Sequence, residues 1–510
     1  MPNPGLKTYF GRVQSGSSIE FRTTFYKGKS VQKVLQEWMP SVQTLEQEWP
    51  SLVAYEKDLA TKVGPMSIMK PLQERMDDID SYYTGILLPQ QPISDSAISA
   101  VLKEWVHVRG MQLRDQHTTL ENMKKSTNSG SPYFTKRRLV ADKIIPSKVY
   151  GDRLISGNDD YKYCAILGWR GQEGGPKPED VKQRVVWMFP FGINLLELQC
   201  YQPLIEQAQR NLLVPAWVSM DAVDERITAM FSTKGKQDDI ICTDFAKFDQ
   251  HFGPVMQEAA KRLLSGILSK GNSQEWLENV YPVKYNIPLA YNWKEMRFGS
   301  HGMASGSGGT NADETLAHRA LQYEVAQANG QMLNPNSQCL GDDGVLTYPN
   351  CKVEDVIRSY TRHGLEMNSS KQYVSKHDCT YLRRWYHEDY QVDGVCRGVY
   401  ATSRAIGRLC EQERFYAPEM WGPVMIALRQ LSILENVKWH PLREQFVSYC
   451  MKGDKYRLGL DISGFLDNIL SISKEAIDLM PDFLGYTKTM QDDVGGIESW
   501  WVVNYLKSLR

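Results

Sequence analysis

The sequence of residues 337–348 is SQCLGDDGVLTY, in which two adjacent aspartates lie between two short apolar runs. The apolar residues at 339–340 and 345–346 predict two β-strands, and the glycines between them predict a tight turn. Asp342 and Asp343 in this turn repel each other unless a cation neutralises them, and carboxylate oxygens with water are the ligands that Mg²⁺ prefers. An exposed hairpin turn without a metal is the alternative, and the stretch alone favours that alternative. A functional metal site therefore requires further residues elsewhere in the chain.

The bulk properties restrict the class of protein. A length of 510 residues exceeds one ordinary hydrophobic core, so roughly two to four subdomains are expected. The formal net charge of −1 argues against a uniformly basic nucleic-acid binder, so any path for a nucleic acid must be lined locally. The nine cysteines include no Cys-x-x-Cys pair, which argues against a zinc ribbon or a disulfide framework and favours an intracellular setting. No apolar segment has the length of a secretory signal or a membrane span, so no membrane partner is expected.

A second acidic site follows a predicted buried strand. The apolar residues 240–242 predict this strand, and Asp244 lies directly after it. Asp249 lies five residues further on, at the start of a predicted helix whose first turn suits Pro254. An acid at a strand end and another at a helix start are compatible with a metal or nucleotide site. A solvated strand end followed by a helix cap explains this stretch equally well.

Residues 299–311 form a glycine-rich segment before a helix predicted over residues 312–328. Such a segment exposes backbone N–H groups at a helix N-terminus, where a phosphate or a sugar edge can bind. Thr310 and Asn311 are expected to cap the helix, which makes the alternative of a flexible linker less favourable.

Three further segments carry basic residues. Residues 182–190 alternate like a strand with Lys182 and Arg184 on one face, which suits triphosphate binding or a charged edge strand. Residues 124–138 combine small and basic residues, as in a loop that approaches a phosphodiester backbone or in an ordinary solvated loop. Residues 381–386 predict a short aromatic strand with two arginines that grips a nucleic-acid backbone.

The alternating order of strands and helices can bring Asp244 and Asp342 together in one sheet. Carboxylates from two strand ends make the arrangement used for two-metal phosphoryl transfer. The basic strand at residues 182–190 would supply the charge that holds a triphosphate.

In their order and spacing these residues resemble the viral RNA-dependent RNA polymerases, in particular those of double-stranded RNA viruses of the picobirnavirus and partitivirus type. The resemblance extends over residues 125–390. Seven motifs of the family are recognisable, in chain order: motif G at residues 127–132, motif F at 182–187, motif A at 244–249, motif B at 305–311, motif C at 341–343, motif D at 368–371 and motif E at 381–384. The order and spacing of the set make the resemblance specific, which Gly-Asp-Asp alone does not.

The resemblance implies a nucleotidyltransferase, an RNA-directed RNA polymerase that transfers ribonucleoside monophosphates from NTPs to an RNA 3′-OH by two-metal catalysis. Asp244 and Asp342 would ligate the metals, Asp343 would have a lesser role near the same ions, and Lys371 would protonate the departing pyrophosphate. The implied cofactor is Mg²⁺, for which Mn²⁺ can substitute. The implied partners are single- and double-stranded RNA, NTPs and a viral capsid protein. The enzyme would act in viral genome replication and transcription, inside the viral particle and in the host cytoplasm.

The family also implies residues that bind nucleotides and RNA. Asp249 would accept a hydrogen bond from the ribose 2′-OH and so select ribonucleotides. Many plus-strand virus enzymes have Asn four residues after the motif B threonine, where this chain has Glu314. Asn311, directly after Thr310, is therefore the expected partner of Asp249. The remaining residues are Ser305, Gly306 and Thr310 at the templating nucleotide and NTP, Lys182 and Arg184 at the triphosphate, and Ser129, Gly130, Pro132 and Arg383 at the template and primer.

The expected fold class is α+β, a right-hand polymerase with fingers, palm and thumb, in which an antiparallel palm sheet packs on helices. The expected segments are an N-terminal extension at 1–95, fingers at 96–235, palm at 236–254, a fingers insertion at 255–298, palm at 299–400, and thumb with C-terminal tail at 401–510. The apolar tail around Trp500 and Trp501 is expected to dock on the fold; whether it also plugs a product channel is left open.

Two other classes of protein compete with this interpretation. A reverse transcriptase would usually have a bulky aromatic residue at the position of Asp249 and an aromatic-x-Asp-Asp turn, whereas this chain has Gly341. A non-catalytic RNA-binding or coat protein would use these acids only to cap turns, and would not need Asp244, the glycine loop and Asp342 in this order.

Overall fold

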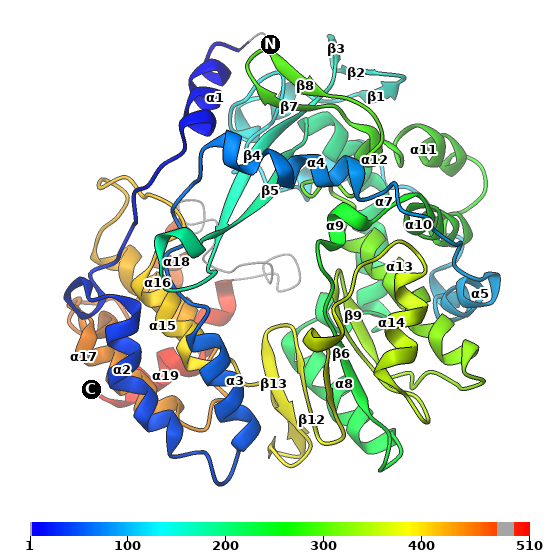
Figure 1. The fold of residues 1–510 in the computed structure, drawn as a ribbon. Coiled ribbons are helices and arrows are strands. Elements are labelled where there is room, and N and C mark those ends of the chain that lie inside the picture. Colours follow the sequence, from blue (N-terminus) through cyan, green and yellow to red (C-terminus); the bar gives the residue numbers. More distant parts are fainter. Residues whose placement is uncertain (1–2, 477–493) are drawn as a thin grey trace. The chain divides into compact units, whose positions relative to one another are not determined.

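The computed structural model describes residues 3–476 and 494–510, which form two compact units (Figure 1). The first unit comprises Met1–Gly16, Pro71–Trp169 and Val185–Tyr381, and the second comprises Ser17–Lys70, Arg170–Arg184 and Leu382–Arg510. Helices and mainly antiparallel sheets are mixed along the chain, which confirms the predicted α+β class. The six predicted segments stay a prediction, and residues 477–493 of the expected thumb lie outside the described residues.

The sheet that carries the acidic residues is antiparallel throughout and has the strand order β11-β6-β10-β9. Its strands are β6 Ile240–Thr243, β9 Gln338–Leu340, β10 Asp343–Leu346 and β11 Tyr373–Ser375. All four residues of β6 are buried, as expected of an apolar strand in the interior of a sheet. Strands β9 and β10 pair as a hairpin, so the two strands and turn predicted from residues 337–348 are confirmed.

Helix α13, Thr310–Ala328, packs against this sheet. It contacts β9 and also α5 Asp95–Glu104, α10 Pro254–Ile267 and α14 Val353–Thr361, and Figure 1 shows α13 and α14 next to β6 and β9. Of its 19 residues 14 are buried, because neighbours surround the helix on nearly every side. A helix in this position can fix the backbone of the hairpin directly.

The predicted caps of this helix are wrong. Thr310 is already helical, Gly309 is the N-cap residue, and no side chain caps the helix. The side chain that binds here comes from two residues before the N-cap, since the Ser307 hydroxyl accepts a hydrogen bond from the Gly309 N–H at 3.0 Å. The glycine loop is thus held by its own serine.

Two further sheets lie mainly in the first unit. One has the order β5-β4-β7-β8, and the other has the order β1-β2-β3. The alternation predicted for residues 182–190 is confirmed in β5, where Val185 and Trp187 are buried and Lys182 and Arg184 are exposed. The bounds of these strands are β1 Ser147–Tyr150, β2 Arg153–Ser156, β3 Asp159–Lys162, β4 Ala165–Gln172, β5 Lys182–Met188, β7 Leu289–Asn292 and β8 Glu295–Arg297.

Other helices of the first unit complete this framework. The long helix α7, Phe191–Arg210, is mostly buried. The remaining helices are α1 Gly5–Ser15, α4 Met76–Thr84, α6 Gln116–Glu121, α8 Met220–Thr233, α9 Phe248–His251, α11 Ser273–Asn279 and α12 Val283–Asn286. Pro254 is at the start of α10, as predicted.

Residues 381–386 do not form the predicted single strand. Strand β12, Asp378–Tyr381, ends where the chain turns, and β13, Arg384–His387, begins after the turn. Leu382 and Arg383 have φ values of 52° and 62°, the left-handed conformation that a two-residue hairpin turn requires. Neither residue is a usual turn former, so no local pattern in residues 381–386 predicts a hairpin here.

The second unit is mainly helical. Its helices are α2 Val31–Gln43, α3 Pro50–Ala60, α15 Thr402–Cys410, α16 Pro423–Glu435, α17 Arg443–Gly453, α18 Ile469–Ala476 and α19 Trp501–Ser508, and its short strands are β14 Gln391–Val392 and β15 Val395–Cys396. The C-terminal tail docks as predicted, because Val502, Val503 and Leu506 of α19 are buried in the core. The Glu435 carboxylate also accepts hydrogen bonds from the N–H groups of Trp501 and Val502, both at 3.0 Å.

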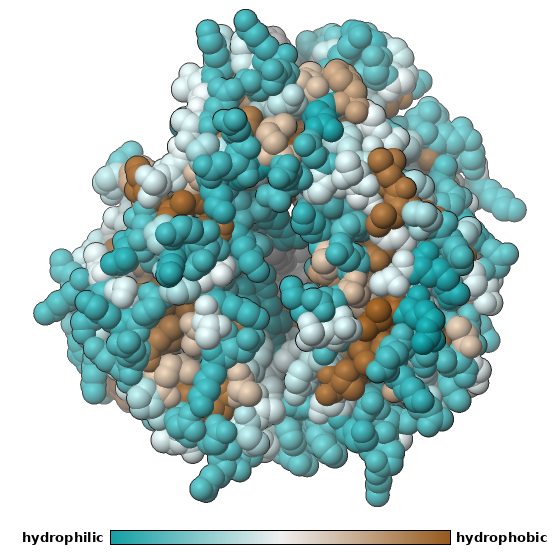
Figure 2. All heavy atoms as spheres, viewed as in Figure 1, coloured by the Kyte–Doolittle hydropathy of each residue, from teal (hydrophilic) through white to brown (hydrophobic). Residues whose placement is uncertain are grey.

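Within the described ranges, no helix is both long enough and apolar enough to cross a membrane. On the face of the molecule in Figure 2, hydrophilic residues predominate and hydrophobic residues form small separate patches.

Candidate active site

The structure brings the three acidic residues to one end of the antiparallel sheet. Asp244 directly follows β6, Asp342 lies in the turn between β9 and β10, and Asp343 is the first residue of β10. Thr243 pairs with Gly344, so continuing the register by one residue places Asp244 opposite Asp343, with Asp342 beside it. Neighbouring strands are about 4.8 Å apart, so the backbones of these residues lie close together at this end of the sheet.

Helix α13 holds the turn through Gly341. The Gly341 N–H donates to Thr315 Oγ1 at 2.9 Å, and the Gly341 carbonyl oxygen lies 2.8 Å from His318 Nδ1. A carbonyl can only accept, so Nδ1 carries the proton and donates. Gly341 has a φ of 58°, a left-handed conformation that favours glycine. Two side chains one helical turn apart therefore bind both polar groups of the residue before Asp342.

His318 is fully buried, and burial lowers its pKa to about 4, against the effect of the bond to Gly341. The imidazole is therefore neutral near pH 7, in the tautomer that the Gly341 carbonyl requires. Rings of Phe245, Phe248 and Tyr360 surround it. This apolar setting keeps the residue a fixed hydrogen-bond donor and not a proton carrier.

The same helix also holds β9. Arg319 donates to the carbonyl of Ser337 at 2.7 Å, and Gln322 Nε2 donates to the carbonyl of Gln338 at 2.9 Å. Burial opposes the charge of Arg319, but the Glu104 carboxylate, 2.6 Å from Arg319 Nη2, raises the pKa of Arg319 well above its usual value. The hairpin is thus anchored by a charged pair as well as by neutral hydrogen bonds.

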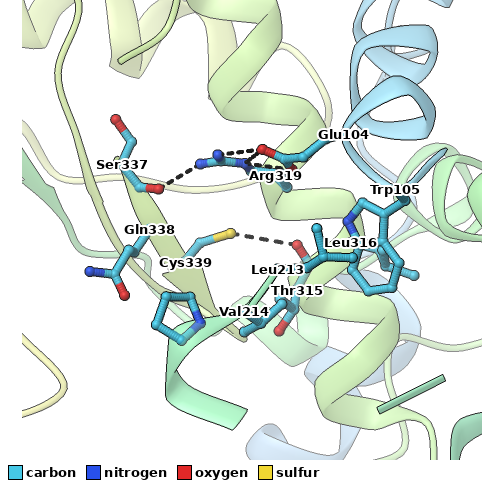
Figure 3. Close-up of a pocket in the computed structure, with 11 residues that line it drawn as sticks. Glu104, Trp105, Leu213, Val214, Thr315, Leu316, Arg319, Ser337, Gln338 and Cys339 are labelled. Atoms are coloured by element: carbon cyan, nitrogen blue, oxygen red, sulfur yellow. Dashed lines mark hydrogen bonds and ion pairs between the residues drawn. The ribbon is translucent and has the colours of Figure 1, made fainter. Parts of the chain in front are cut away.

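A small cavity lies between α13 and β9 (Figure 3). Its volume of about 20 Å³ is enough for one water molecule, so it is not a substrate pocket. Its lining residues are Glu104, Trp105, Leu213, Val214, Pro215, Thr315, Leu316, Arg319, Ser337, Gln338 and Cys339.

The glycine loop before α13 is fixed from two sides. On one side, the Trp187 N–H donates to the Ser305 carbonyl at 2.8 Å, and the Ser305 hydroxyl donates to the Val185 carbonyl at 3.1 Å. Gly306 has a φ of 133°, and a Cβ at this position would lie 1.8 Å from the Trp187 carbonyl oxygen. Only glycine therefore fits at 306.

On the other side, the buried carboxylate of Glu197 from α7 binds the loop. It accepts hydrogen bonds from the Ser307 hydroxyl, from the Gly308 N–H at 3.1 Å and from Asn194 Nδ2 at 3.0 Å. Burial raises the pKa of Glu197, while the charge of Lys284 and these donors act in the opposite direction. A single carboxylate thus accepts hydrogen bonds from two consecutive residues of the loop, Ser307 and Gly308.

Asn194 extends this network toward the predicted template loop. Its amide nitrogen lies 3.4 Å from the Gly306 carbonyl, and its amide oxygen accepts a bond from Arg137 Nη2 at 2.7 Å. Ser129 and Gly130 are buried, and the Ser129 carbonyl accepts a bond from the Phe191 N–H at 2.9 Å. Pro132 is half-buried in the same loop. The loops of motifs G and B are therefore joined through the start of α7.

Asp249 lies in α9 and is buried. Its carbonyl accepts a bond from the Met303 N–H at 2.8 Å, which ties it to the glycine loop. The Asn311 amide oxygen accepts a bond from Trp217 Nε1 at 2.8 Å. Across the described part of the chain no hydrogen bond joins Asn311 to Asp249, so their predicted pairing is not seen. Thr310 Oγ1 lies 3.3 Å from the Ser307 carbonyl, inside the loop.

The other predicted residues lie apart from this group along the chain. Lys371 is exposed at the end of a short 3₁₀ helix, Ser369–Lys371, just before β11. Lys182, Arg184 and Arg383 are exposed residues of the second unit. Their roles stay predictions.

Sequence reasoning missed Thr315, His318, Glu197 and Asn194. The available signal is the occurrence of polar side chains within helical stretches that are otherwise apolar, such as residues 191–201, since a buried polar group requires a partner.

The acidic residues fit a divalent cation whose other ligands are water and substrate phosphates. In residues 3–476 and 494–510, no three His, Cys, Asp or Glu side chains are grouped closely enough to form a preassembled metal site. Mg²⁺ needs no such cage, because it commonly binds one or two carboxylates together with water and substrate phosphates. Asp244, Asp342 and Asp343 supply oxygen donors of this type.

Comparison with known proteins assigns the family. The family model for viral RNA-dependent RNA polymerases matches residues 106–397. A protein of human picobirnavirus (strain Human/Thailand/Hy005102/-), described as a potential RNA-dependent RNA polymerase, is 59% identical over 521 residues, which cover 100% of this chain and 98% of the relative.

Two solved structures agree with this assignment. The crystal structure of the RNA-dependent RNA polymerase of a human picobirnavirus is 59% identical, with a TM-score of 0.96, and covers 100% of this chain and 98% of that one. The crystal structure of an insertion-loop deletion mutant of a human picobirnavirus polymerase is 57% identical, with a TM-score of 0.95. The match covers 100% of this chain and 97% of that one. The chain is therefore an RNA-directed RNA polymerase, a nucleotidyltransferase that belongs to the viral RNA-dependent RNA polymerases and resembles those of the picobirnaviruses.

Proposed function

We propose that this polymerase extends RNA by two-metal catalysis, with Asp244 and Asp342 as the main ligands of two Mg²⁺ ions and Asp343 in a lesser role. The register that places Asp244 opposite Asp343, beside Asp342, carries this proposal. When bound, the cations would lower the pKa of the attacking 3′-OH and offset the charge that develops on the phosphoryl group, and Mn²⁺ could replace Mg²⁺. The carboxylates come from two neighbouring parts of the sheet, the end of β6 and the β9–β10 turn, and so determine where the cations would bind.

Other residues would bind and orient the substrates. Asp249 accepts a hydrogen bond from the ribose 2′-OH, and Ser305, Gly306, Thr310 and Asn311 shape the site of the templating nucleotide and NTP. For these roles, the support is the fixed backbone of the glycine loop, which leaves little freedom at Ser305 and Gly306. The charged residues Lys182 and Arg184 hold the triphosphate, and Lys371 gives a proton to the pyrophosphate.

RNA would be guided by Ser129, Gly130, Pro132 and Arg383. For Ser129 and Gly130 the support is their burial, which suits a role in shaping the loop backbone. In the virus the enzyme would replicate and transcribe the genome with a capsid protein as partner, in the particle interior and the host cytoplasm.

Purified protein, an RNA template, NTPs and Mg²⁺ test this function. We expect RNA synthesis that requires the cation and prefers NTPs to dNTPs, with the preference reduced in Asp249→Ala. Cation-independent synthesis would refute the metal mechanism, and a preference for dNTPs would refute the assignment of Asp249.

A further inference from the structure

The side-chain amide of Gln372 makes a two-point contact with the backbone of Asp244. The Asp244 N–H donates to Gln372 Oε1 at 2.8 Å, and Gln372 Nε2 donates to the Asp244 carbonyl at 2.8 Å. Gln372 Nε2 also donates to the Asn368 carbonyl at 2.9 Å. One amide group therefore binds both polar backbone groups of Asp244 and the start of the loop that carries Lys371.

This contact lies where the strand pairing ends. Strands β11 and β6 pair up to Tyr373 and Cys242, two residues before Asp244. An amide side chain has the same donor and acceptor as a peptide group, so Gln372 continues the ladder at Asp244 in the manner of a strand neighbour. Gln372 thus supplies a partner for both backbone groups of Asp244 beyond the last strand pair.

A second contact holds the next residues of the same segment. The Ala246 N–H donates to the carbonyl of Glu366 at 2.9 Å. Residues 244–246 are thus bound at both ends by the chain from 366 to 372, within one unit of the structure. Lys371 precedes Gln372 directly, so the predicted proton donor and the predicted metal ligand share one hydrogen-bonded segment.

We propose that Gln372 is a positioning residue for the reaction: it fixes the backbone of Asp244 so that its carboxylate meets the cations, and it couples this carboxylate to the Lys371 loop. This inference rests on the proposed role of Asp244. Gln372 touches no reacting atom and acts only through the backbone of Asp244. Its amide can be removed with little disturbance of the core, because the side chain is only half-buried.

The experiment compares four proteins: wild type, Gln372→Ala, Gln372→Glu and a matched control, Gln391→Ala. Glu at 372 keeps the acceptor for the Asp244 N–H but removes both N–H donors. Gln391 is an exposed glutamine that also donates to a backbone carbonyl, that of Glu388 at 2.9 Å, but in the second unit. Each protein is assayed for melting temperature, for hydrogen exchange of the peptide containing Asp244, and for nucleotide incorporation as a function of Mg²⁺ and NTP concentration.

We expect Gln372→Ala and Gln372→Glu to melt close to wild type and to lower kcat by about 10- to 100-fold. Gln372→Ala should also lose amide protection at Asp244, whereas Gln372→Glu, which keeps the acceptor, should retain more of it. The Mg²⁺ concentration at half-maximal rate should rise several-fold, while the KM for NTPs changes little. Gln391→Ala should match wild type. Unchanged kcat and Mg²⁺ dependence in both Gln372 variants would overturn the proposal, and so would a loss of activity explained fully by a lower melting temperature.

Asp244→Asn, assayed in parallel, separates this proposal from the proposed function. An active Asp244→Asn would refute the role of Asp244 itself. An inactive Asp244→Asn together with wild-type behaviour of the Gln372 variants would refute only the positioning role of Gln372.

Discussion

His318 Nδ1 lies 2.8 Å from the carbonyl oxygen of Gly341, the residue directly before Asp342. The bond fixes the peptide plane that leads into Asp342, and Thr315 binds the N–H of the same glycine. The orientation of the acidic turn thus depends on a helix that begins 31 residues earlier, at Thr310.

Removing the His318 bond should reduce catalysis more than substrate binding. In His318→Phe the Gly341 carbonyl loses its donor, so we expect kcat to fall about 10- to 100-fold with little change in the KM for NTPs. His318→Asn keeps an N–H at nearly the position of Nδ1 and should retain more activity. Steady-state incorporation assays measure both. Equal activity of His318→Phe and wild type would contradict the role of this bond.

His318 should also make stability depend on pH. The unfolded chain binds a proton at this residue near pH 6.5, whereas burial lowers the folded pKa to about 4. Acid therefore favours unfolding: the stability is complete above pH 6.5 and falls by about 1.4 kcal/mol per pH unit between pH 6.5 and 4. Melting curves at pH 7.5 and 5.0 should show a smaller loss in His318→Asn than in wild type. An identical loss in the two proteins would show that His318 does not titrate in this way.

Gly306→Ala should inactivate the enzyme. The new Cβ would lie 1.8 Å from the Trp187 carbonyl oxygen at a φ of 133°, so the glycine loop must move. We expect a loss of activity of at least about 100-fold. Gly299→Ala is the matched control, since it also has a positive φ, of 103°, but its Cβ would meet no atom within 4 Å. The prediction fails if both variants have the same activity.

Glu197 should stabilise the glycine loop through its hydrogen bonds. Glu197→Ala leaves the Ser307 hydroxyl, the Gly308 N–H and the Asn194 amide without their acceptor, which should cost about 3 kcal/mol of unfolding free energy. Glu197→Gln keeps one acceptor oxygen, and the Ser307 hydroxyl can turn to accept, so its loss should be about 1 kcal/mol. Thermal or urea unfolding measures the difference. Similar losses in the two variants would mean that the carboxylate packs but does not bind the loop.

Local patterns were enough to predict the acidic hairpin, the strand before Asp244 and the alternation in β5, because each is set by neighbours in sequence. The bonds of Gln372 to Asp244 and of Glu197 to Gly308 join residues 128 and 111 positions apart, which no local pattern encodes. The turn at Leu382 and Arg383 was missed because tertiary structure imposes a left-handed conformation on residues that seldom adopt it.

The most direct test of the account is single-turnover nucleotide incorporation by Asp244→Asn, Asp342→Asn and Asp343→Asn over a Mg²⁺ titration, on a primed RNA template. Asn keeps the size of the side chain and removes its charge. We predict at least about a 1000-fold loss for Asp244→Asn and for Asp342→Asn and a smaller loss for Asp343→Asn, with unchanged melting temperatures. Near wild-type rates in either Asp244→Asn or Asp342→Asn would contradict the proposal that these two carboxylates are the main ligands of the catalytic cations.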